Sequence, residues 1–249
     1  MPTAASLHYC KKFTKKEIEG ENFDEIKCDI LHLGTLYDNR KEFLIKIAPW
    51  VKKNKYKMIL TGMGNEPTKV PKELHEFFVP IDKISTIPAM DRLQALNHAD
   101  TVLLYNCAKI VLNINRLTID LDRKISSNIK YRVEGESLNP RCYEVPMSGS
   151  VLATDKIRKE YKMFKWKPND ERRQIIAFED VDEFMAQAKP ILESETYRNK
   201  IRENAFGYAA KNHSYKNRAA RLMRYILINL GKKQEALAFM LQFGIGTKK

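Results

Sequence analysis

The chain has 249 residues, of which 43% are hydrophobic and 30% are charged, a balance typical of folded globular proteins rather than disordered ones. Its 44 Lys and Arg residues outnumber the 31 Asp and Glu residues and give a net charge of +13. Such a charge attracts nucleic acid, anionic membrane surfaces or phosphorylated ligands, although a solvated lysine-rich surface has the same composition. No stretch approaches the roughly 18 uninterrupted apolar residues of a membrane span, so we expect no transmembrane segment.

The N-terminus and the cysteines bear on the compartment. Residues 1–6 lack the basic segment and apolar core of a secretory signal. The four cysteines include no C-x-x-C pair, and their scattered positions fit neither a zinc site nor a disulfide framework. Reduced thiols in a cytosolic protein explain this pattern, so we expect a cytoplasmic protein that binds no metal.

Short apolar runs alternate with patterns of helical spacing along the first two thirds of the chain. Strands separated by helices require right-handed crossovers and favour a mostly parallel, doubly wound sheet. The sequence therefore predicts an α/β fold with a single Rossmann-like domain. The expected strands are 28–34, 57–62, a weak 77–79, 109–114, 150–154 and 174–178, with helices at 42–51, 91–105 and 141–147.

The last third of the chain is expected to be helical. Apolar spacing predicts helices over 182–192 and 197–211, and Ser214 is a favourable N-cap for a third helix that stops near Gly231. A final amphipathic segment covers 234–243. In the third helix one face is apolar, formed by Ala219, Leu222, Met223, Ile226 and Leu230.

These patterns predict one domain with a segment on either side. The first residues are polar and poorly patterned, which is typical of a linker or an arm. We therefore expect an N-terminal arm or linker over 1–27, a Rossmann-like domain over 28–230 and a helical extension over 231–249.

Ligands of doubly wound sheets bind at the carboxyl ends of the strands, so the residues that follow each expected strand are candidates. Gly34 permits a close backbone approach after the first strand, and Arg40 is placed to meet a diphosphate near the next helix start. Asn113, Asn115 and Arg116 follow another strand with two amides and a guanidinium, which suit hydroxyls and phosphate oxygens. Ordinary turns and polar loops have the same composition, so both interpretations stand.

The segment 62–65 begins like a dinucleotide-binding fingerprint, Gly-Met-Gly-Asn. Pro67 stands where that fingerprint requires its third glycine. This departure disfavours a nicotinamide-dependent oxidoreductase. The remaining interpretation of the segment is a glycine-rich turn that lies beside a phosphate or a sugar.

Two carboxylates, Glu136 and Glu144, are eight positions apart, one in a loop and one in the expected helix 141–147. A carboxylate accepts two hydroxyl hydrogen bonds at once, so the pair is suited to hold a ribose and a sugar ring. Arg141 is placed to neutralise a nearby phosphate, and Gly149 allows tight packing or contact before the next strand. Two solvated glutamates would have the same spacing.

The run from 139 to 155 resembles the R-x-x-E-x-x-x-x-G-x-x-x-x-x-D core of group 1 glycosyltransferases, especially their CgeB-like branch. Glu136 and Glu144 match the family's E-x7-E pair. Residues 104–113 resemble the same branch's L-Y-N-x-A-K-I-x-L-N strand, and 213–219 resemble its closing H-T-Y-x-x-R-A element. The resemblance covers most of residues 28–228, with its elements in the correct order.

The resemblance implies a GT-B architecture, in which two Rossmann-like domains face each other and the C-terminal one binds a nucleotide-sugar without a metal or other cofactor. Glu144 would then hold the ribose and Glu136 the transferred sugar. Arg40 and Arg141 would face the diphosphate, with Arg141 stabilising it as the leaving group. The full expected set is Glu136 and Arg141 as catalytic residues, with Gly34, Arg40, Asn113, Arg116, Glu136, Glu144 and Gly149 binding the donor.

One departure from the family is that only about 27 residues precede the first expected strand. The acceptor-binding domain would then come from a separate polypeptide, or the chain is a half of a longer enzyme or forms a homo-oligomer. The donor would be a UDP-, GDP- or ADP-sugar, and the acceptor a polysaccharide, a protein or a modified nucleic acid. The alternative is a non-catalytic nucleotide-sugar- or nucleic-acid-binding module with a degenerate glycosyltransferase fold.

Overall fold

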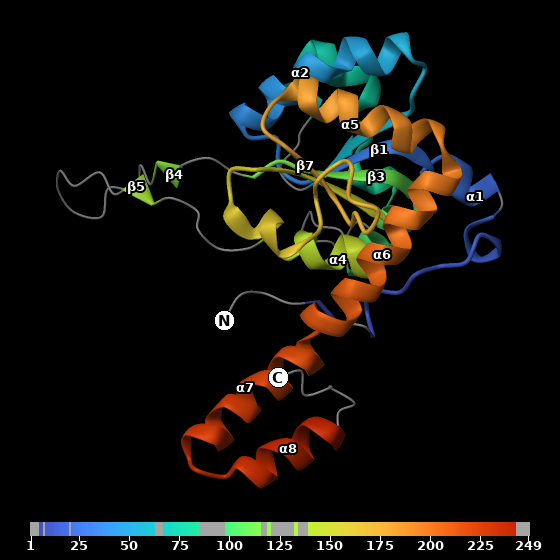
Figure 1. The fold of residues 1–249 in the computed structure, drawn as a ribbon. Coiled ribbons are helices and arrows are strands. Elements are labelled where there is room, and N and C mark those ends of the chain that lie inside the picture. The colour runs from blue at the N-terminus through green and yellow to red at the C-terminus, as the bar shows by residue number, and fades with distance from the viewer. Residues whose placement is uncertain are drawn as a thin grey trace.

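In the computed structural model a parallel β-sheet lies between two layers of helices, and a pair of helices extends from one end (Figure 1). The structure describes residues 5–6, 8–19, 21–62, 67–84, 98–115, 119–120, 132–133 and 139–242.

The central sheet has five strands in the order β2-β1-β3-β6-β7, all parallel. The chain leaves β1 toward β2 on one side and then crosses back to β3 on the other, so the carboxyl ends of β1 and β3 form the topological switch point. This arrangement confirms the predicted α/β, doubly wound parallel sheet. The strands are β1 Cys28–Leu33, β2 Met58–Thr61, β3 Ala108–Asn113, β6 Val151–Asp155 and β7 Ile176–Phe178, with two-residue antiparallel strands β4 Ile119–Asp120 and β5 Arg132–Val133 forming a separate pair.

Alternating side chains of the strands face two separate apolar cores. Ile30 packs with the helices of one layer, whereas its neighbour Leu31 packs with those of the other, as the two-residue period of a strand requires. Helices α2 (Asp38–Lys53) and α5 (Val181–Glu193) cover the first face. The second face is covered by α3 His98–Cys107, α4 Arg141–Met147 and α6 Glu195–His213, while the short α1 Glu21–Asp24 precedes β1.

The expected strand at 77–79 is wrong. A 3-10 helix, Lys72–Phe77, occupies the start of this region, and only one isolated bridge joins Phe78 to Leu60 of β2. Pro80 follows directly and has no N–H to continue a ladder, while the Phe77 side chain is buried against α2. The expected helix 91–105 is described from His98 onward, and its first seven positions lie outside the described residues.

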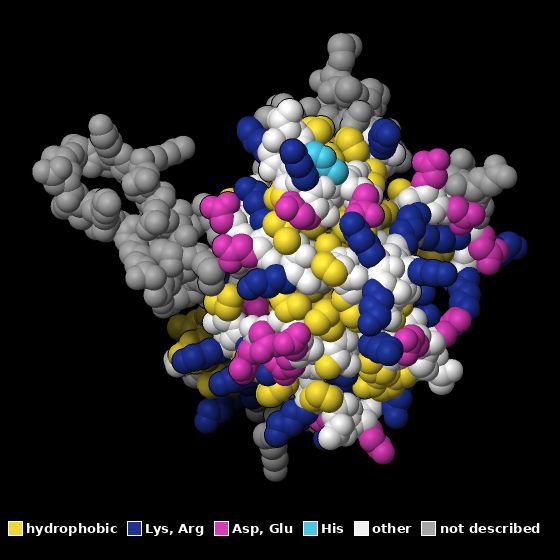
Figure 2. Space-filling model, turned by 90° about the horizontal axis from the view of Figure 1, so that it is seen from above, with side chains coloured by type: hydrophobic (Ala, Val, Ile, Leu, Met, Phe, Trp, Pro, Cys, Tyr) yellow, Lys and Arg dark blue, Asp and Glu magenta, His cyan; other side chains and the backbone are white. Residues whose placement is uncertain are grey.

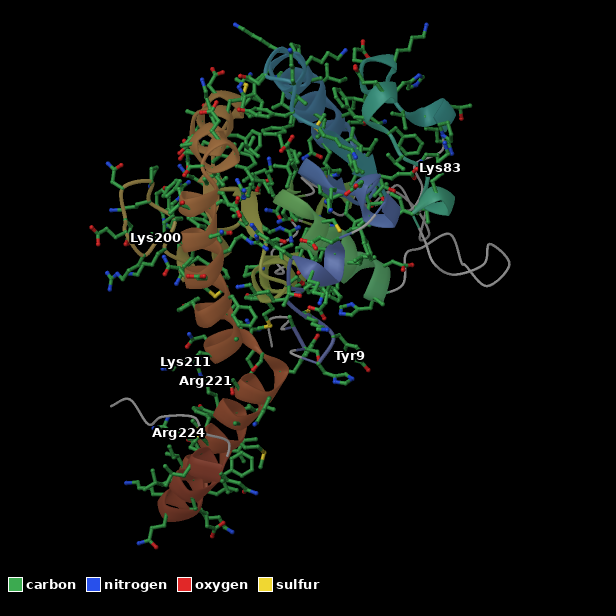
Figure 3. All side chains as sticks on the ribbon, turned by 90° about the vertical axis from the view of Figure 1, so that its right-hand side faces the viewer. Tyr9, Lys83, Lys200, Lys211, Arg221 and Arg224 are labelled. Atoms are coloured by element: carbon green, nitrogen blue, oxygen red, sulfur yellow. The ribbon has the colours of Figure 1, made fainter. Side chains whose placement is uncertain are left out.

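The C-terminal helices follow the predicted pattern. Ser214 separates α6 from α7 (Tyr215–Asn229) and caps α7 by accepting a hydrogen bond from the backbone N–H of Asn217 at 3.2 Å. α7 and α8 (Lys233–Gln242) pack against each other and project from the sheet domain, with Arg221 and Arg224 on α7 (Figures 1 and 3). No helix in the described ranges is both long and apolar enough to cross a membrane.

The apolar face of α7 is exposed to solvent rather than packed on the domain. Leu222, Met223, Ile226 and Leu230 are 41%, 39%, 38% and 66% exposed. Helical apolar faces of this size ordinarily pack against another surface. We call these four residues the α7 stripe.

The N-terminal segment packs along the domain. Ala5 pairs with the α6–α7 junction, where its N–H donates to the His213 carbonyl at 3.2 Å and its carbonyl accepts from the Tyr215 N–H at 3.0 Å. Further along, the Phe13 N–H donates to the Asn106 side chain on α3 at 2.8 Å. Residues from the expected arm thus form part of the described surface of the domain.

The excess positive charge is not gathered on the face over α2 and α5. Figure 2 shows Lys and Arg side chains there interspersed with Asp, Glu and apolar side chains. On this face the net charge of +13 therefore produces no continuous basic patch.

Candidate functional site

The switch point of the sheet brings three elements together. β1 ends at Leu33 and is followed by Gly34, β3 ends at Asn113, and α4 begins at Arg141 beside them. In open α/β sheets a ligand binds in the crevice outside these strand ends. We call Gly34, Arg40, Asn113, Arg141 and Glu144 the carboxyl-edge site.

Gly34 occupies a position that only glycine fits without strain. Its φ is +143°, and a Cβ there would lie 3.3 Å from Nη2 of Arg141 and 3.4 Å from Nη1 of Arg40. Gly62, after β2, has φ +144°, and a Cβ on it would lie 2.5 Å from the Gly34 backbone nitrogen. The two glycines therefore allow the backbone after β1 to contact the backbone after β2, next to the guanidinium groups of Arg40 and Arg141.

Arg141 is held in place by neutral oxygens. Its Nη1 donates to Oδ1 of Asn113 at 3.2 Å, its Nε to the Tyr105 hydroxyl at 3.4 Å, and its Nη2 to the carbonyl of Leu33. The side chain is half-buried. Because none of these partners carries a negative charge, the orientation of the guanidinium is fixed while its positive charge remains available to an anion.

Arg40 stabilises the loop after β1 through hydrogen bonds to backbone carbonyls. It is 7% exposed, its Nε donates to the carbonyl of Ile114 and its Nη1 to that of Thr35, both at 2.8 Å, and its guanidinium lies 5.1 Å from the Tyr37 ring centre. These contacts tie the β1–α2 loop to the end of β3. Arg40 thus adds positive charge beside Gly34 as part of the scaffold.

Asn113 organises the start of α4. Its side chain is fully buried, and its Nδ2 donates to Oγ1 of Thr154 at 3.1 Å. Its Oδ1 accepts from Nδ2 of Asn139 at 3.0 Å and from Arg141. The expected ligand-facing amide is therefore committed to positioning Arg141.

Glu144 lies one helical turn after Arg141 on α4 and is half-buried. Burial raises the pKa of its carboxyl group above the ordinary value of 4.5, while the nearby charges of His98 and Arg141 work in the opposite direction. Its carboxylate makes no hydrogen bond with any of the described residues. A partly buried carboxylate without such partners is costly to the fold and is typical of a ligand site.

A buried thiol and a buried imidazole adjoin the site. Burial and the charge of Glu144 raise the pKa of Cys10 to about 12, so this thiol stays protonated. His32 in β1 is fully buried, and burial, followed by the charges of Arg141 and Arg40, lowers its pKa well below its ordinary value.

Asp155 was not singled out as a site residue from the sequence, yet it secures the loop after β3. Its Oδ2 accepts from the Asn115 N–H at 2.5 Å, and its Oδ1 accepts from the Asn115 side chain at 2.7 Å and from the Ile157 N–H at 3.3 Å. Burial raises its pKa despite these hydrogen bonds. Its place as the last residue of β6 was the available signal, since strand ends line such sites.

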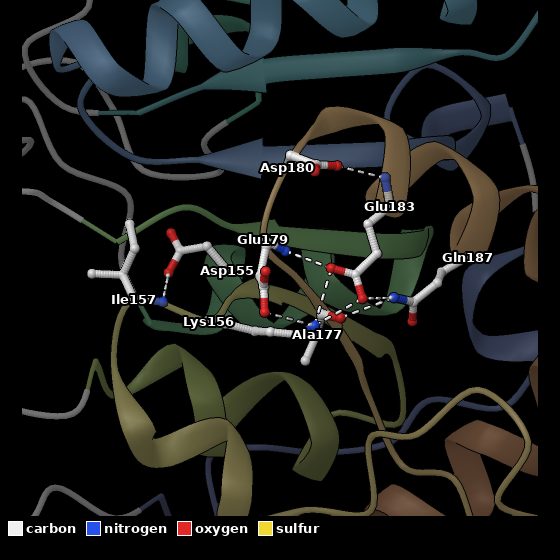
Figure 4. A network of polar contacts seen from close by, with 8 residues as sticks. All are labelled: Asp155, Lys156, Ile157, Ala177, Glu179, Asp180, Glu183 and Gln187. Carbon is white, nitrogen blue, oxygen red and sulfur yellow. Dashed lines mark hydrogen bonds and ion pairs between the residues drawn. The ribbon is translucent and has the colours of Figure 1, made fainter.

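A polar network closes the edge beyond β6 and β7 (Figure 4). Lys156 lies 2.8 Å from Oε1 of Glu183 and 3.4 Å from Glu179, and the backbone N–H of Glu179 donates to Glu183 at 2.7 Å. Burial disfavours the charged form of Lys156, but the hydrogen bond and charge of Glu183 outweigh it and raise its pKa. This cation is therefore committed to two carboxylates, unlike Arg141.

Of the remaining predicted residues, the structure describes only Gly149. Gly149 follows the opposite end of α4, where its φ of +72° ends the helix, a Cβ would lie 2.7 Å from the Lys12 side chain, and its carbonyl accepts from Arg202. It is therefore separated from the carboxyl-edge site. Arg116 and Glu136 lie outside the described residues, so the convergence of Glu136 with Glu144 stays a prediction. Within the described ranges no three carboxylate, imidazole or thiol groups gather as metal ligands would.

Several of the solved structures similar to this chain are glycosyltransferases or a domain of one. The C-terminal domain of a group 1 family glycosyl transferase, LpcC, from Francisella tularensis superposes with a TM-score of 0.55 at 10% identity, covering 85% of this chain and 99% of that one. A glycosyltransferase from Rickettsia africae gives 0.53 at 13% identity, covering 94% and 56%. HepE from Anabaena, solved in complex with UDP, gives 0.54 at 12% identity, covering 85% and 52%.

These similarities establish the fold, which is that of a GT-B C-terminal domain, and the chain spans about half the length of the Rickettsia and Anabaena proteins. No curated protein sequence matches it significantly. A family model described as Glycosyl transferase-like matches residues 41–224, about three quarters of the chain. The protein therefore belongs to the Glycosyl transferase-like family.

Proposed function

We propose that this chain binds a nucleotide-sugar at the carboxyl-edge site and acts as the donor-binding half of a glycosyltransferase. One observation carries the proposal: Arg141, oriented only by neutral oxygens, lies one turn from Glu144, a half-buried carboxylate with no hydrogen bond among the described residues. A fixed cation beside a carboxylate that lacks partners is complementary to a diphosphate joined to a diol.

In this proposal Arg141 meets the diphosphate and Glu144 accepts hydrogen bonds from the two ribose hydroxyls. Gly34 lets the diphosphate approach the backbone, and Arg40 adds positive charge without leaving its loop. A cation already positioned at the leaving diphosphate stabilises the charge that develops as the glycosidic bond breaks. Glu136 would contact the transferred sugar and Arg116 the donor, as the resemblance to the CgeB-like branch implies.

We further propose that residues 28–230 form the donor domain and that the acceptor-binding domain is a separate polypeptide, another part of a longer protein, or a second copy. Two observations support this: the chain spans about half of the larger solved enzymes, and the α7 stripe is exposed. An apolar surface of this kind is typical of an interface.

The test is calorimetric titration of the chain with a panel of UDP-, GDP- and ADP-sugars. We expect one nucleotide class to bind with one site per chain, and we expect transfer only when the acceptor-binding domain is present. If no nucleotide-sugar binds to the folded chain, the alternative of a non-catalytic module is favoured. HepE has been solved with UDP-glucose, which makes UDP-glucose the first member of the panel.

Nucleic acid is a further proposed acceptor because of the net charge of +13. The mixed charges over α2 and α5 (Figure 2) give it no support on that face. Binding to DNA would fall steeply with rising salt concentration, whereas a polysaccharide acceptor would show little salt dependence.

A further inference from the structure

A pocket lies at the amino edge of the sheet, at the opposite end of β1 from the carboxyl-edge site. Its volume is about 460 Å³, within the range of small-molecule sites. Its lining includes the first residues of β1 and β3, Phe13 and Ile18 of the N-terminal segment, and Arg198 and Arg202 of α6. We call it the amino-edge pocket. The six residues of β1 separate it from the carboxyl-edge site by about 20 Å.

Half of the cations in this pocket are already neutralised. Lys15 pairs with Glu195 at 2.5 Å and Lys109 with Asp29 at 2.6 Å, and both carboxylates also line the pocket. Lys27 pairs with Asp24 at 2.8 Å. These three lysines therefore have carboxylate partners and contribute little attraction for a ligand.

Three other cations have only neutral oxygen partners among the described residues. Nζ of Lys57 donates to the carbonyls of Asp24 and Glu25, both at 2.8 Å. Nη1 of Arg198 donates to the Ile191 carbonyl at 2.8 Å near the end of α5. Nε of Arg202 donates to the carbonyl at position 149.

The two arginines are one turn apart on α6, where like charges destabilise a helix. Arg198 is 8% exposed and Arg202 is half-buried. Burial lowers the pKa of both guanidinium groups, and the charge of Arg198 lowers that of Arg202 further, while the charge of nearby Glu195 opposes the shift in both. Arg198 donates one hydrogen bond to a carbonyl near the end of α5, and no described carboxylate forms an ion pair with either arginine, although Glu195 lies near both. An anion bound between them would turn this repulsion into attraction.

We propose that the amino-edge pocket binds the phosphoryl group of a small molecule through Arg198, Arg202 and Lys57. Guanidinium groups present paired donors that match phosphate oxygens. Phe13 and Ile18 supply apolar surface for the rest of the ligand, which favours a sugar phosphate over free phosphate. This site is separate from the one proposed for the nucleotide-sugar.

The experiment is calorimetric titration of the full chain with inorganic phosphate, pyrophosphate and glucose 1-phosphate. Arg202→Gln and Lys57→Gln each remove one pocket cation, and we expect each to weaken binding about tenfold through a lost charge-assisted contact. Lys200→Gln, in an exposed residue on the same helix (Figure 3), removes the same charge outside the pocket lining and should leave binding unchanged. Lys57→Gln is the second variant in case Arg202→Gln does not fold.

The outcomes separate the two sites. The proposal is supported if glucose 1-phosphate binds more tightly than inorganic phosphate. This binding should be lost in Arg202→Gln and Lys57→Gln and kept in Arg141→Gln. Binding that is lost in Arg141→Gln and kept in the pocket variants assigns the anion to the carboxyl-edge site and overturns it. Equal weakening by Lys200→Gln, or no binding of any probe, overturns it as well, and neither result bears on nucleotide-sugar binding.

Discussion

Replacing Glu144 by glutamine should weaken nucleotide-sugar binding and at the same time stabilise the unliganded protein. The carboxylate is proposed to accept two ribose hydroxyl hydrogen bonds, and each bond to a charged acceptor contributes about 1.5–3 kcal/mol. Glutamine keeps one acceptor oxygen, so we expect a net loss of about 1–3 kcal/mol, or about fivefold to about 150-fold in Kd. Calorimetric titration with the nucleotide-sugar that binds the natural chain measures this change.

The stability effect follows from the raised pKa of Glu144, whose first cause is burial. The folded state holds this proton more tightly than the unfolded chain does, so the stabilising contribution is complete below the ordinary pKa of 4.5 and is lost as pH rises through the raised value. At pH 7 the ionised carboxylate therefore destabilises the fold, and Glu144→Gln should raise Tm. The gain should disappear as pH falls below about 4.5.

The control is Glu203→Gln, because Glu203 is an exposed glutamate on α6. It should change neither Kd nor Tm appreciably. Unchanged nucleotide-sugar affinity in Glu144→Gln would refute the ribose assignment, and a lower Tm at pH 7 would refute the reasoning from burial.

Three further predictions concern the scaffold around the site. Gly34→Ala should lower the free energy of unfolding in urea by about 1–3 kcal/mol because φ is +143°, whereas Gly207→Ala, in a helix with open space around it, should raise it by about 0.5–1 kcal/mol. Asp155→Asn should cost about 1–3 kcal/mol in the same assay, because the new amide faces the Asn115 N–H donors; an unchanged midpoint would contradict this. Burial lowers the pKa of His213 to about 4, so its stabilising contribution is present above pH 6.5 and is lost as pH falls toward 4. The fall in Tm between pH 7 and 5 should therefore be smaller in His213→Gln than in the natural chain. An equal fall in the two proteins would contradict this role of His213.

The sequence alone was sufficient for most of the described strands and helices and for the fold class. Alternation around Ile30 and Leu31 reflects a strand buried on both faces, and this period depends only on neighbouring residues. Ser214 was recognisable as an N-cap because its hydrogen bond spans three residues. Repeated strands and helices then restrict the topology to a parallel, doubly wound sheet.

The failure at 77–79 has a local cause. Two aromatic residues and a valine have high strand propensity, but Pro80 ends any ladder and the Phe77 side chain finds its burial against α2. The burial of Phe77 against α2 therefore outweighs the strand propensity of this segment, and the sequence pattern gives no sign of that contact.

Tertiary structure alone decided how the candidate residues are grouped. Gly149 is close to Glu144 in sequence, yet the length of α4 carries it to the other end of the helix, whereas Asp155 and Asn115 meet across two strands. The exposure of the α7 stripe and the meeting of Lys57 with Arg202 in one pocket likewise depend on contacts between distant parts of the chain. Sequence period specifies which face of an element is apolar, but the partner of that face, and the charges that converge on a pocket, are set by how the elements pack.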